Sequence, residues 1–175
     1  NDHSINHLTI DRPKETKVGL IKENNGNIQK LNLNDISVSG KSTVGSLVGE
    51  NTGIGSISDI SVNGQIDASG DNVGGVIGEN SGSVHSISGS VSVSGDSSVG
   101  GIVGRSSRGK ITKVSTGGTV TGTEDVGGVV GSIATVNNEA TVSRAEAHGS
   151  VNGNTNVGGV VGNSQSSGLI RNVSA

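Results

Sequence analysis

The chain has 175 residues; Gly (31) and Ser (28) make about a third of it, and Phe, Trp, Tyr, Met and Cys are absent. Because Cys is absent, disulfides and thiolate metal sites are excluded. The formal net charge is −3, and the sequence shows neither a basic patch nor aromatic residues, which disfavours nucleic-acid binding. No apolar run reaches the ~18 residues of a membrane-spanning helix, so membrane insertion is not expected.

The aliphatic content separates this chain from a flexible Gly/Ser linker. Val, Ile and Leu number 24, 15 and 6, which is 45 of 175 residues. This fraction is above that of disordered chains. The sequence therefore predicts an ordered protein with a narrow core of small, mostly β-branched side chains.

The first 16 residues differ from the rest. Residues 8–10 alternate in a way that suits a short strand, and Pro13 interrupts it. Because terminal units of repeat proteins need a polar cap, we predict that residues 1–16 form an N-terminal capping segment.

A Val-Gly-Gly-aliphatic-aliphatic-Gly pattern then recurs along the chain. Units begin near residues 17, 44, 73, 99, 126 and 157, at spacings of 27, 29, 26, 27 and 31 residues. The sixth unit is cut short at Ala175, which predicts that the chain is part of a longer protein. Such periodicity is typical of stacked repeat architectures.

Each unit also carries two kinds of short apolar stretch. Aliphatic residues three apart recur at Ile28/Leu31, Ile57/Ile60, Val84/Ile87, Ile111/Val114, Val142/Ala145 and Ile170/Val173. Alternating stretches follow at residues 36–38, 66–68, 91–93, 120–122 and 151–153. Short β-branched runs bounded by Gly, Asn, Ser and Asp indicate strands, and the abundant Gly disfavours helix.

These observations predict an all-β fold. A unit of about 27 residues cannot bury its own apolar face, whereas stacked units can. We therefore expect a β-solenoid, specifically a right-handed parallel β-helix of about six coils, over residues 17–175.

One aliphatic column conflicts with simple alternation. It contains Leu20, Leu47, Val76, Ile102, Val129 and Val160. Strict alternation would place it on the face opposite the other apolar residues, and exposed apolar stripes usually mark contacts. Because flanking glycines permit a sharp bend, we expect this column to be buried within the chain, with a partner chain as the alternative cover.

The repeat resembles the GLUG-motif repeat. The match is clearest at residues 75–82, Gly-Val-Ile-Gly-Glu-Asn-Ser-Gly, and continues at residues 46–53, where Ser46 replaces the first glycine. Later units depart from it, with Ser106 and Ser164 in place of Asn. The resemblance implies an extracellular β-solenoid module of a large secreted or wall-attached bacterial protein, such as an adhesin-like protein or the non-catalytic region of an IgA-specific metallo-endopeptidase.

Asn24, Asn51 and Asn80 occupy one column over three consecutive units. We interpret them as a structural ladder in which side-chain amides bond along the solenoid axis. Ligand binding by the same column is the alternative.

Glu23, Glu50 and Glu79 form the neighbouring column. Like charges at coil spacing repel, so these side chains are expected to splay into solvent. Glu50 and Glu79 are weak candidates for a site binding a hard cation such as Ca²⁺, which prefers oxygen ligands. Arg105, one unit further on, could instead neutralise Glu79. No other cofactor or metal is indicated.

Small polar residues line the expected outer side of the alternating stretches. The candidate ligand-face residues are Ser90, Ser92, Ser94, Thr119, Thr121 and Thr123. A flat Ser/Thr array can order water, so ice or a glycan is the candidate ligand, and an ordinary solvated face is the alternative.

Catalysis is not expected. The histidines, His3, His7, His85 and His148, fall at unrelated repeat positions, and the His-Glu-x-x-His zinc motif is absent. We predict a non-enzymatic structural or adhesive module, a rigid stalk or ligand-presenting face, at the bacterial cell surface. Its partner would be a cell-surface glycan or protein, or ice. Ice or glycan binding through the Ser/Thr face, and an accessory domain of a secreted metalloprotease, are the alternatives.

Overall fold

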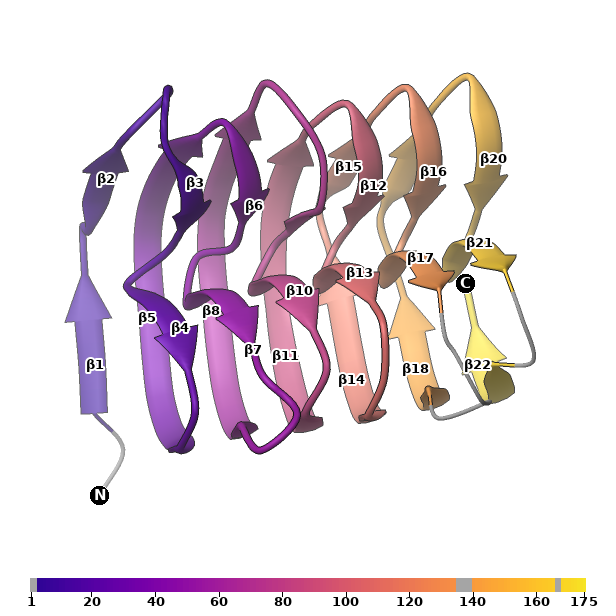
Figure 1. Cartoon of the computed structure of the whole chain (residues 1–175), viewed down its shortest axis with the longest axis horizontal. Coiled ribbons are helices and arrows are strands. Elements are labelled where there is room, and N and C mark those ends of the chain that lie inside the picture. Colours follow the sequence, from indigo (N-terminus) through magenta and orange to yellow (C-terminus); the bar gives the residue numbers. More distant parts are fainter. Residues whose placement is uncertain (1–2, 135–139, 166–167) are drawn as a thin grey trace.

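The computed structural model describes residues 3–134, 140–165 and 168–175. The chain winds into a rod of about six coils, and the N- and C-terminal ends of the chain lie at opposite ends of it (Figure 1). Every coil contributes strands to three parallel sheets, so the predicted β-solenoid is confirmed. Over the described residues, no helix has the length and apolar character needed to cross a membrane.

The broad sheet forms one side of the rod and contains the longest strands. Its strands are β1 (His3–Asn6), β2 (Thr9–Asp11), β5 (Asn27–Gly40), β8 (Ser56–Ala68), β11 (Ser83–Ser94), β14 (Lys110–Gly117), β15 (Thr119–Thr121), β18 (Thr141–Ala147), β19 (Ser150–Asn152) and β22 (Leu169–Ser174).

Two narrower sheets complete each coil. The first contains β3 (Thr16–Val18), β6 (Ser42–Val44), β9 (Val73–Gly74), β12 (Ser97–Gly100), β16 (Glu124–Gly127) and β20 (Thr155–Gly158). The second contains β4 (Ile21–Asn24), β7 (Val48–Asn51), β10 (Ile77–Asn80), β13 (Val103–Ser106), β17 (Val130–Ala134) and β21 (Val161–Gln165).

Each strand pairs in parallel with its equivalent one coil further on. Val84 pairs with Ile57 and Ile111, and Val99 pairs with Val73 and Val126. Because neighbouring strands lie ~4.8 Å apart, six coils give a rod of roughly 30 Å. The right-handed sense of the coil stays a prediction.

The N-terminal segment joins this stack as strands. β1 pairs with β5, placing His3 beside Leu31, and β2 continues along the same strand. In the narrow sheets of the first unit Val18 pairs with Val44, and Glu23 pairs with Glu50. The capping role of residues 1–16 stays a prediction.

The aliphatic residues spaced three apart point inward together because a residue between them has a left-handed backbone conformation. Asp59, between Ile57 and Ile60, has φ of 55°, and both isoleucines are at most 2 % exposed. A residue in the left-handed region breaks the alternation of a strand, so positions i and i+3 reach the same face. The equivalent left-handed residues are Lys30, Ser86, Lys113, Arg144 and Asn172.

The alignment of the alternating stretches needs one correction. Ile66 pairs with Val93 and Val38, rather than with Val91 and Ile36 as expected. The position beside Ile36 and Val91 is held by Gly64, which has φ of 148°. Gly64 places no side chain in the core. An alignment that matches aliphatic residues between units therefore pairs Ile66 two positions away from its true partners.

The disputed aliphatic column is buried inside the chain, as expected. Leu47, Val76, Ile102 and Val129 are fully buried, and Val160 is 8 % exposed. Leu20, in the first coil, is only partly buried and packs against the core. The glycines before them bend the chain inward until it meets the broad sheet. An added Cβ at Gly128, for example, would lie 2.7 Å from Cβ of Ala147.

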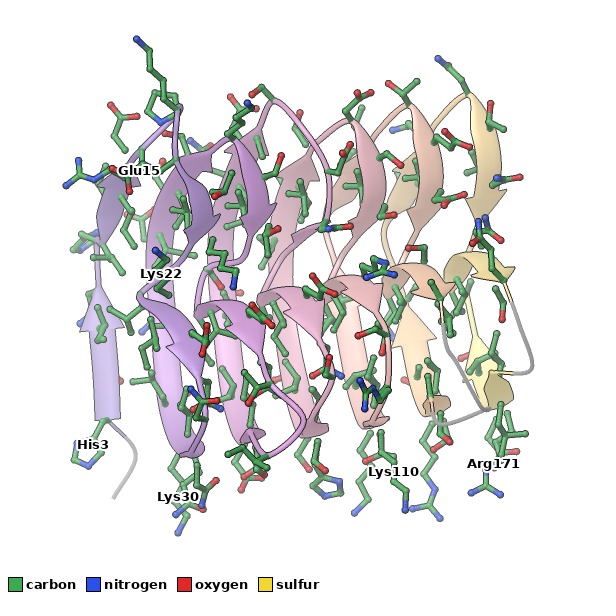
Figure 2. All side chains as sticks on the ribbon, in the orientation of Figure 1. His3, Glu15, Lys22, Lys30, Lys110 and Arg171 are labelled. Carbon is green, nitrogen blue, oxygen red and sulfur yellow. The ribbon has the colours of Figure 1, made fainter. Side chains whose placement is uncertain are left out.

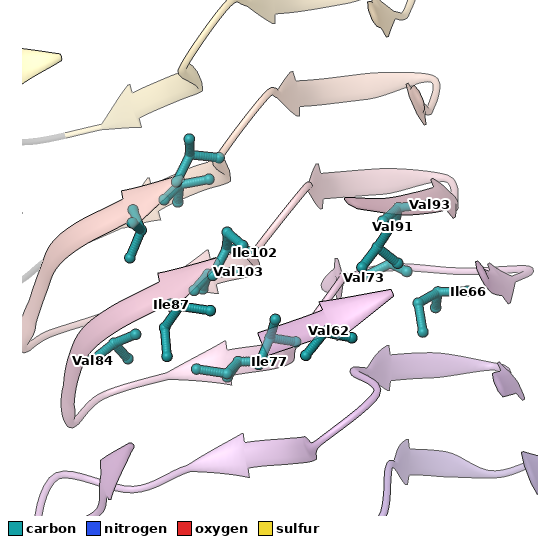
Figure 3. Close-up of a cluster of buried hydrophobic side chains, with 14 of the residues drawn as sticks. Val62, Ile66, Val73, Ile77, Val84, Ile87, Val91, Val93, Ile102 and Val103 are labelled. Atoms are coloured by element: carbon teal, nitrogen blue, oxygen red, sulfur yellow. The ribbon is translucent and has the colours of Figure 1, made fainter. Parts of the chain in front are cut away.

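The buried side chains form one core along the rod, built from Val, Ile, Leu and Ala. Figure 3 shows valines and isoleucines of this core, with Val62 lying between Ile77 and Ile66. The absence of aromatic residues from the sequence agrees with a core filled by side chains of this size.

Candidate functional site

The asparagine column forms a chain of buried side-chain amides. Nδ2 of Asn24 donates to Oδ1 of Asn51 over 2.8 Å, and Nδ2 of Asn51 donates to Oδ1 of Asn80 over 2.8 Å. Asn51 and Asn80 are fully buried, and Asn24 is 6 % exposed. These are the hydrogen bonds that the predicted ladder requires.

The same amides also close the turn that follows each of them. The backbone amide of Gly26 donates to Oδ1 of Asn24, and that of Gly82 donates to Oδ1 of Asn80. The column continues to Ser106, whose Oγ donates to the carbonyl of Arg108. The oxygen and nitrogen of these amides are therefore used in hydrogen bonds within the fold, as a structural ladder requires.

The neighbouring glutamates are paired with cations instead of splaying freely. Nζ of Lys17 lies 2.5 Å from Glu50 and 3.6 Å from Glu23, and the Arg105 guanidinium lies 2.8 Å from Glu79. A hydrogen bond from Asn25, assisted by the Lys17 charge, lowers the pKa of Glu23. The hydrogen bond and charge of Glu50, with Glu23, raise the pKa of Lys17.

These contacts give the two candidate calcium ligands other partners. Glu50 faces Lys17, and Glu79 faces Arg105 as the alternative interpretation expected. Within the described ranges, no three His, Asp or Glu side chains are grouped so that they could hold a metal ion. The calcium hypothesis stays a prediction.

The glutamate column belongs to a longer polar seam that the sequence did not reveal. Across from it lies a column of left-handed residues, Lys17, Thr43, Asn72, Ser98, Asp125 and Asn156. Later coils join the two columns by hydrogen bonds, with Oγ of Ser98 2.8 Å from Oγ of Ser132. Nδ2 of Asn163 likewise donates to Asp125 over 2.8 Å.

Glycine brings the two columns of the polar seam together. An added Cβ at Gly78 would lie 2.6 Å from the backbone of Thr43, because the two narrow sheets meet backbone to backbone there. This is why Gly49 and Gly78 precede Glu50 and Glu79, whereas Lys22 precedes Glu23 in the first coil. In the polar seam, ion pairs and hydrogen bonds link neighbouring coils.

The predicted ligand-face residues are all exposed, and all but Thr123 lie on the outer side of the broad sheet. The pairing sets Ser92 beside Gln65 and Ser94 beside Asp67 and Thr121. Thr119 and Thr121 continue to Ser150 and Asn152 in the following coil. The columns are therefore mixed, with amide and carboxylate side chains between the hydroxyls.

Four of the six residues line one hollow. This hydroxyl pocket has a volume of about 290 Å³ and is lined by Gln65, Ile66, Asp67, Ser92, Val93, Ser94, Thr119 and Thr121. Ser90 pairs with Asn63 and Gly117, one step away along the sheet, and Thr123 follows β15 in a turn. The structure thus gathers the central candidates and leaves out Ser90 and Thr123.

A second hollow gathers cations that the sequence analysis did not single out. This basic pocket, about 430 Å³, is lined by His85, Lys110, Thr112, Thr141, Ser143, Arg144, Arg171 and Asn172. The expectation that the chain lacks a basic patch is therefore wrong. The signal was present, because the residues between aliphatics three apart must point outward, and in later coils they include Lys113, Arg144 and Arg171.

Comparison with solved structures supports the fold. The crystal structure of a putative immunoglobulin A1 protease from Bacteroides ovatus matches 99 % of this chain and 67 % of that chain, with a TM-score of 0.67. The sequence identity is 15 %, so the likeness concerns the fold.

Comparison with curated proteins gives a shorter match. Halomucin from Haloquadratum walsbyi is 36 % identical over 81 residues, which is 45 % of this chain. The chain spans about 1 % of that protein's length. No family profile matches the chain, and the GLUG-type repeat stays a prediction.

Proposed function

We propose that this chain is a non-enzymatic structural module of an extracellular surface protein, a short rigid rod that spaces or presents other parts of a longer molecule. The observation that carries the proposal is the continuous parallel pairing in all three sheets from the first coil to the last. Hydrogen bonds between backbones then run along the whole rod axis, and such a rod resists bending and proteolysis because few backbone groups are free.

The comparisons support a setting outside the cell. An enzyme that cleaves immunoglobulin A1, a secreted antibody, meets its substrate there, and the similar Bacteroides ovatus fold carries that description. The match to a small part of halomucin suits a repeated module within a much longer protein. The GLUG-type resemblance of residues 46–53 and 75–82 supports the same setting at a bacterial surface.

Limited proteolysis tests the rigid rod. We expect the folded chain to resist proteinase K for hours, Ser92→Asp to behave like the parent, and Ile87→Asp to be degraded rapidly, since Ile87 is 1 % exposed and a buried charge disrupts packing. Cleavage of the parent within the central coils would contradict the proposal.

An activity assay tests the non-enzymatic part of the proposal. Incubation of the chain with immunoglobulin A1 should yield no antibody fragments; fragments would show that the module is enzymatic.

The shape of the hydroxyl pocket favours a second candidate function, binding of a neutral glycan. Its hollow form and mixed lining suit a sugar ring better than the flat lattice of ice, and Ser94 and Thr121 stand side by side to bond its hydroxyls. A neutral oligosaccharide array should then give signals that Thr121→Val abolishes and Thr123→Val preserves. Thermal hysteresis in a freezing assay would favour ice instead.

A further inference from the structure

The basic pocket lies on the outer face of the broad sheet, away from the polar seam. Its charged side chains come from separate coils, with Lys110 on β14, Arg144 on β18 and Arg171 on β22. Figure 2 shows Lys110 and Arg171 projecting from the same edge of the rod. Since the strands are ~4.8 Å apart, the pocket repeats its positive groups at roughly that spacing along the axis.

The lining is positive and rich in hydrogen-bond donors. It holds three permanent cations, and none of its eight residues is Asp or Glu. Thr112 pairs with Ser143, and Ser143 pairs with Arg171, so one column carries two hydroxyls next to a charge. Nδ1 of His85 lies 2.9 Å from Oγ1 of Thr112, and this hydrogen bond fixes the Thr112 side chain at one end of the column. The chain as a whole carries −3, so this positive field is local.

Stacking cations on successive coils raises their mutual repulsion, and a bound anion relieves it. Two arginines offer planar forks that match sulfate or carboxylate groups, and the lysine adds a point charge. The hydroxyl and amide side chains can bond the neutral hydroxyls of the same ligand. The volume, about 430 Å³, falls in the range of small-ligand sites.

We propose that the basic pocket binds an acidic polysaccharide, one that repeats sulfate or carboxylate groups along its chain. A nucleic acid would also be attracted by charge, but its unpaired bases need aromatic side chains to stack on, and the sequence contains none. The proposal goes beyond the rod function and does not depend on it, because it names a ligand class for a surface that a purely mechanical role leaves unused.

Binding of a heparin-derived hexasaccharide and of an oligogalacturonate, followed by calorimetry at 50 and 150 mM salt, tests the proposal and separates sulfate from carboxylate recognition. We expect at least one to bind, and the double variant Arg144→Gln/Arg171→Gln to weaken it at least tenfold with a smaller salt dependence. Both arginines are exposed, so folding is preserved and can be checked by the thermal midpoint.

The matched control removes the same charge elsewhere. Lys14→Gln/Lys22→Gln alters two exposed lysines near the other end of the rod and should change affinity less than twofold. Equal losses of affinity in both double variants would show that binding depends only on general charge attraction, and would overturn the proposal. Failure of both saccharides to bind would also overturn it, as would tighter binding of a single-stranded oligonucleotide of the same charge.

Discussion

The side-chain amide of Asn51 donates a hydrogen bond to that of Asn80 one coil further on, over 2.8 Å, in a position closed to solvent. Asn51 is also the acceptor for Asn24, so it is the central member of a three-amide chain. Each amide must point in the same direction along the axis for every donor to meet an acceptor, which fixes how neighbouring coils stack.

Asn51→Ala should therefore destabilise the fold more than removal of an exposed amide. It leaves Asn24 short of an acceptor and Asn80 short of a donor, at a cost of about 1–3 kcal/mol. Asn34→Ala, which breaks an exposed amide pair with Asn6, should cost no more than about 0.5 kcal/mol. Urea denaturation measures both, and equal midpoints for the two variants would contradict a stabilising ladder.

The inward bend predicts that glycines differ sharply in tolerance. Gly128→Ala would drive a methyl group against Ala147 and the backbone of Gly159, and we expect a loss of about 3 kcal/mol from overpacking. An added Cβ at Gly53 meets no atom within 4 Å, so Gly53→Ala should change stability by less than about 0.5 kcal/mol. Thermal midpoints compare the two. A tolerated Gly128→Ala would mean that the bend can open.

Thr43 offers a test of backbone strain in the polar seam. It is β-branched and held at φ of 55°, a region that costs such residues about 1 kcal/mol and that Asn tolerates. Thr43→Asn should raise the free energy of unfolding by up to that amount. The same change at Thr121, in an extended strand, should give no gain because Asn is a poorer strand former. Chemical denaturation that showed a loss at Thr43 would refute the strain argument.

The Glu23 carboxyl should titrate below its usual range. Since its pKa is lowered first by Asn25 and then by Lys17, Asn25→Ala should raise it more than Lys17→Gln. Because the folded pKa is depressed, the contact stabilises the fold above the unfolded pKa near 4.5 and is lost as the pH falls through the folded value. NMR titration of the Glu23 carboxyl carbon measures its pKa in the parent and in both variants. A larger effect of Lys17→Gln would reverse the assigned order of causes.

Much of the fold could be predicted because the repeat imposes its own geometry. The spacing of Ile57 and Ile60 is copied in every unit, so the inward columns and the burial of Val129 followed from comparing units. The register of the alternating stretches did not follow, because Gly64 leaves no trace in an apolar pattern. A glycine adds no side chain to the apolar pattern, so that pattern cannot locate its position in the register.

The candidate sites divide in the same way. The asparagine column repeats one residue type at a fixed place, so stacking alone predicted its contacts. The basic pocket repeats only a charge, supplied by Lys110, Arg144 and Arg171 from three successive coils, and residue-by-residue alignment did not find it. The polar seam was missed because its two columns meet only after the chain has turned through the glycine bend.

The parallel pairing of every strand with its equivalent makes the boundary between coils nearly the same wherever it is cut. Excision of residues 73–98 would bring Val44 beside Val99, two positions that already share a partner in Val73. A gene encoding such a chain can gain or lose whole repeats, and the encoded protein keeps its core. Loss of half a repeat would instead place the glycine bend of one coil beside a strand of the next. Length is thus a heritable variable that changes in increments of one coil, about 4.8 Å of reach at a time.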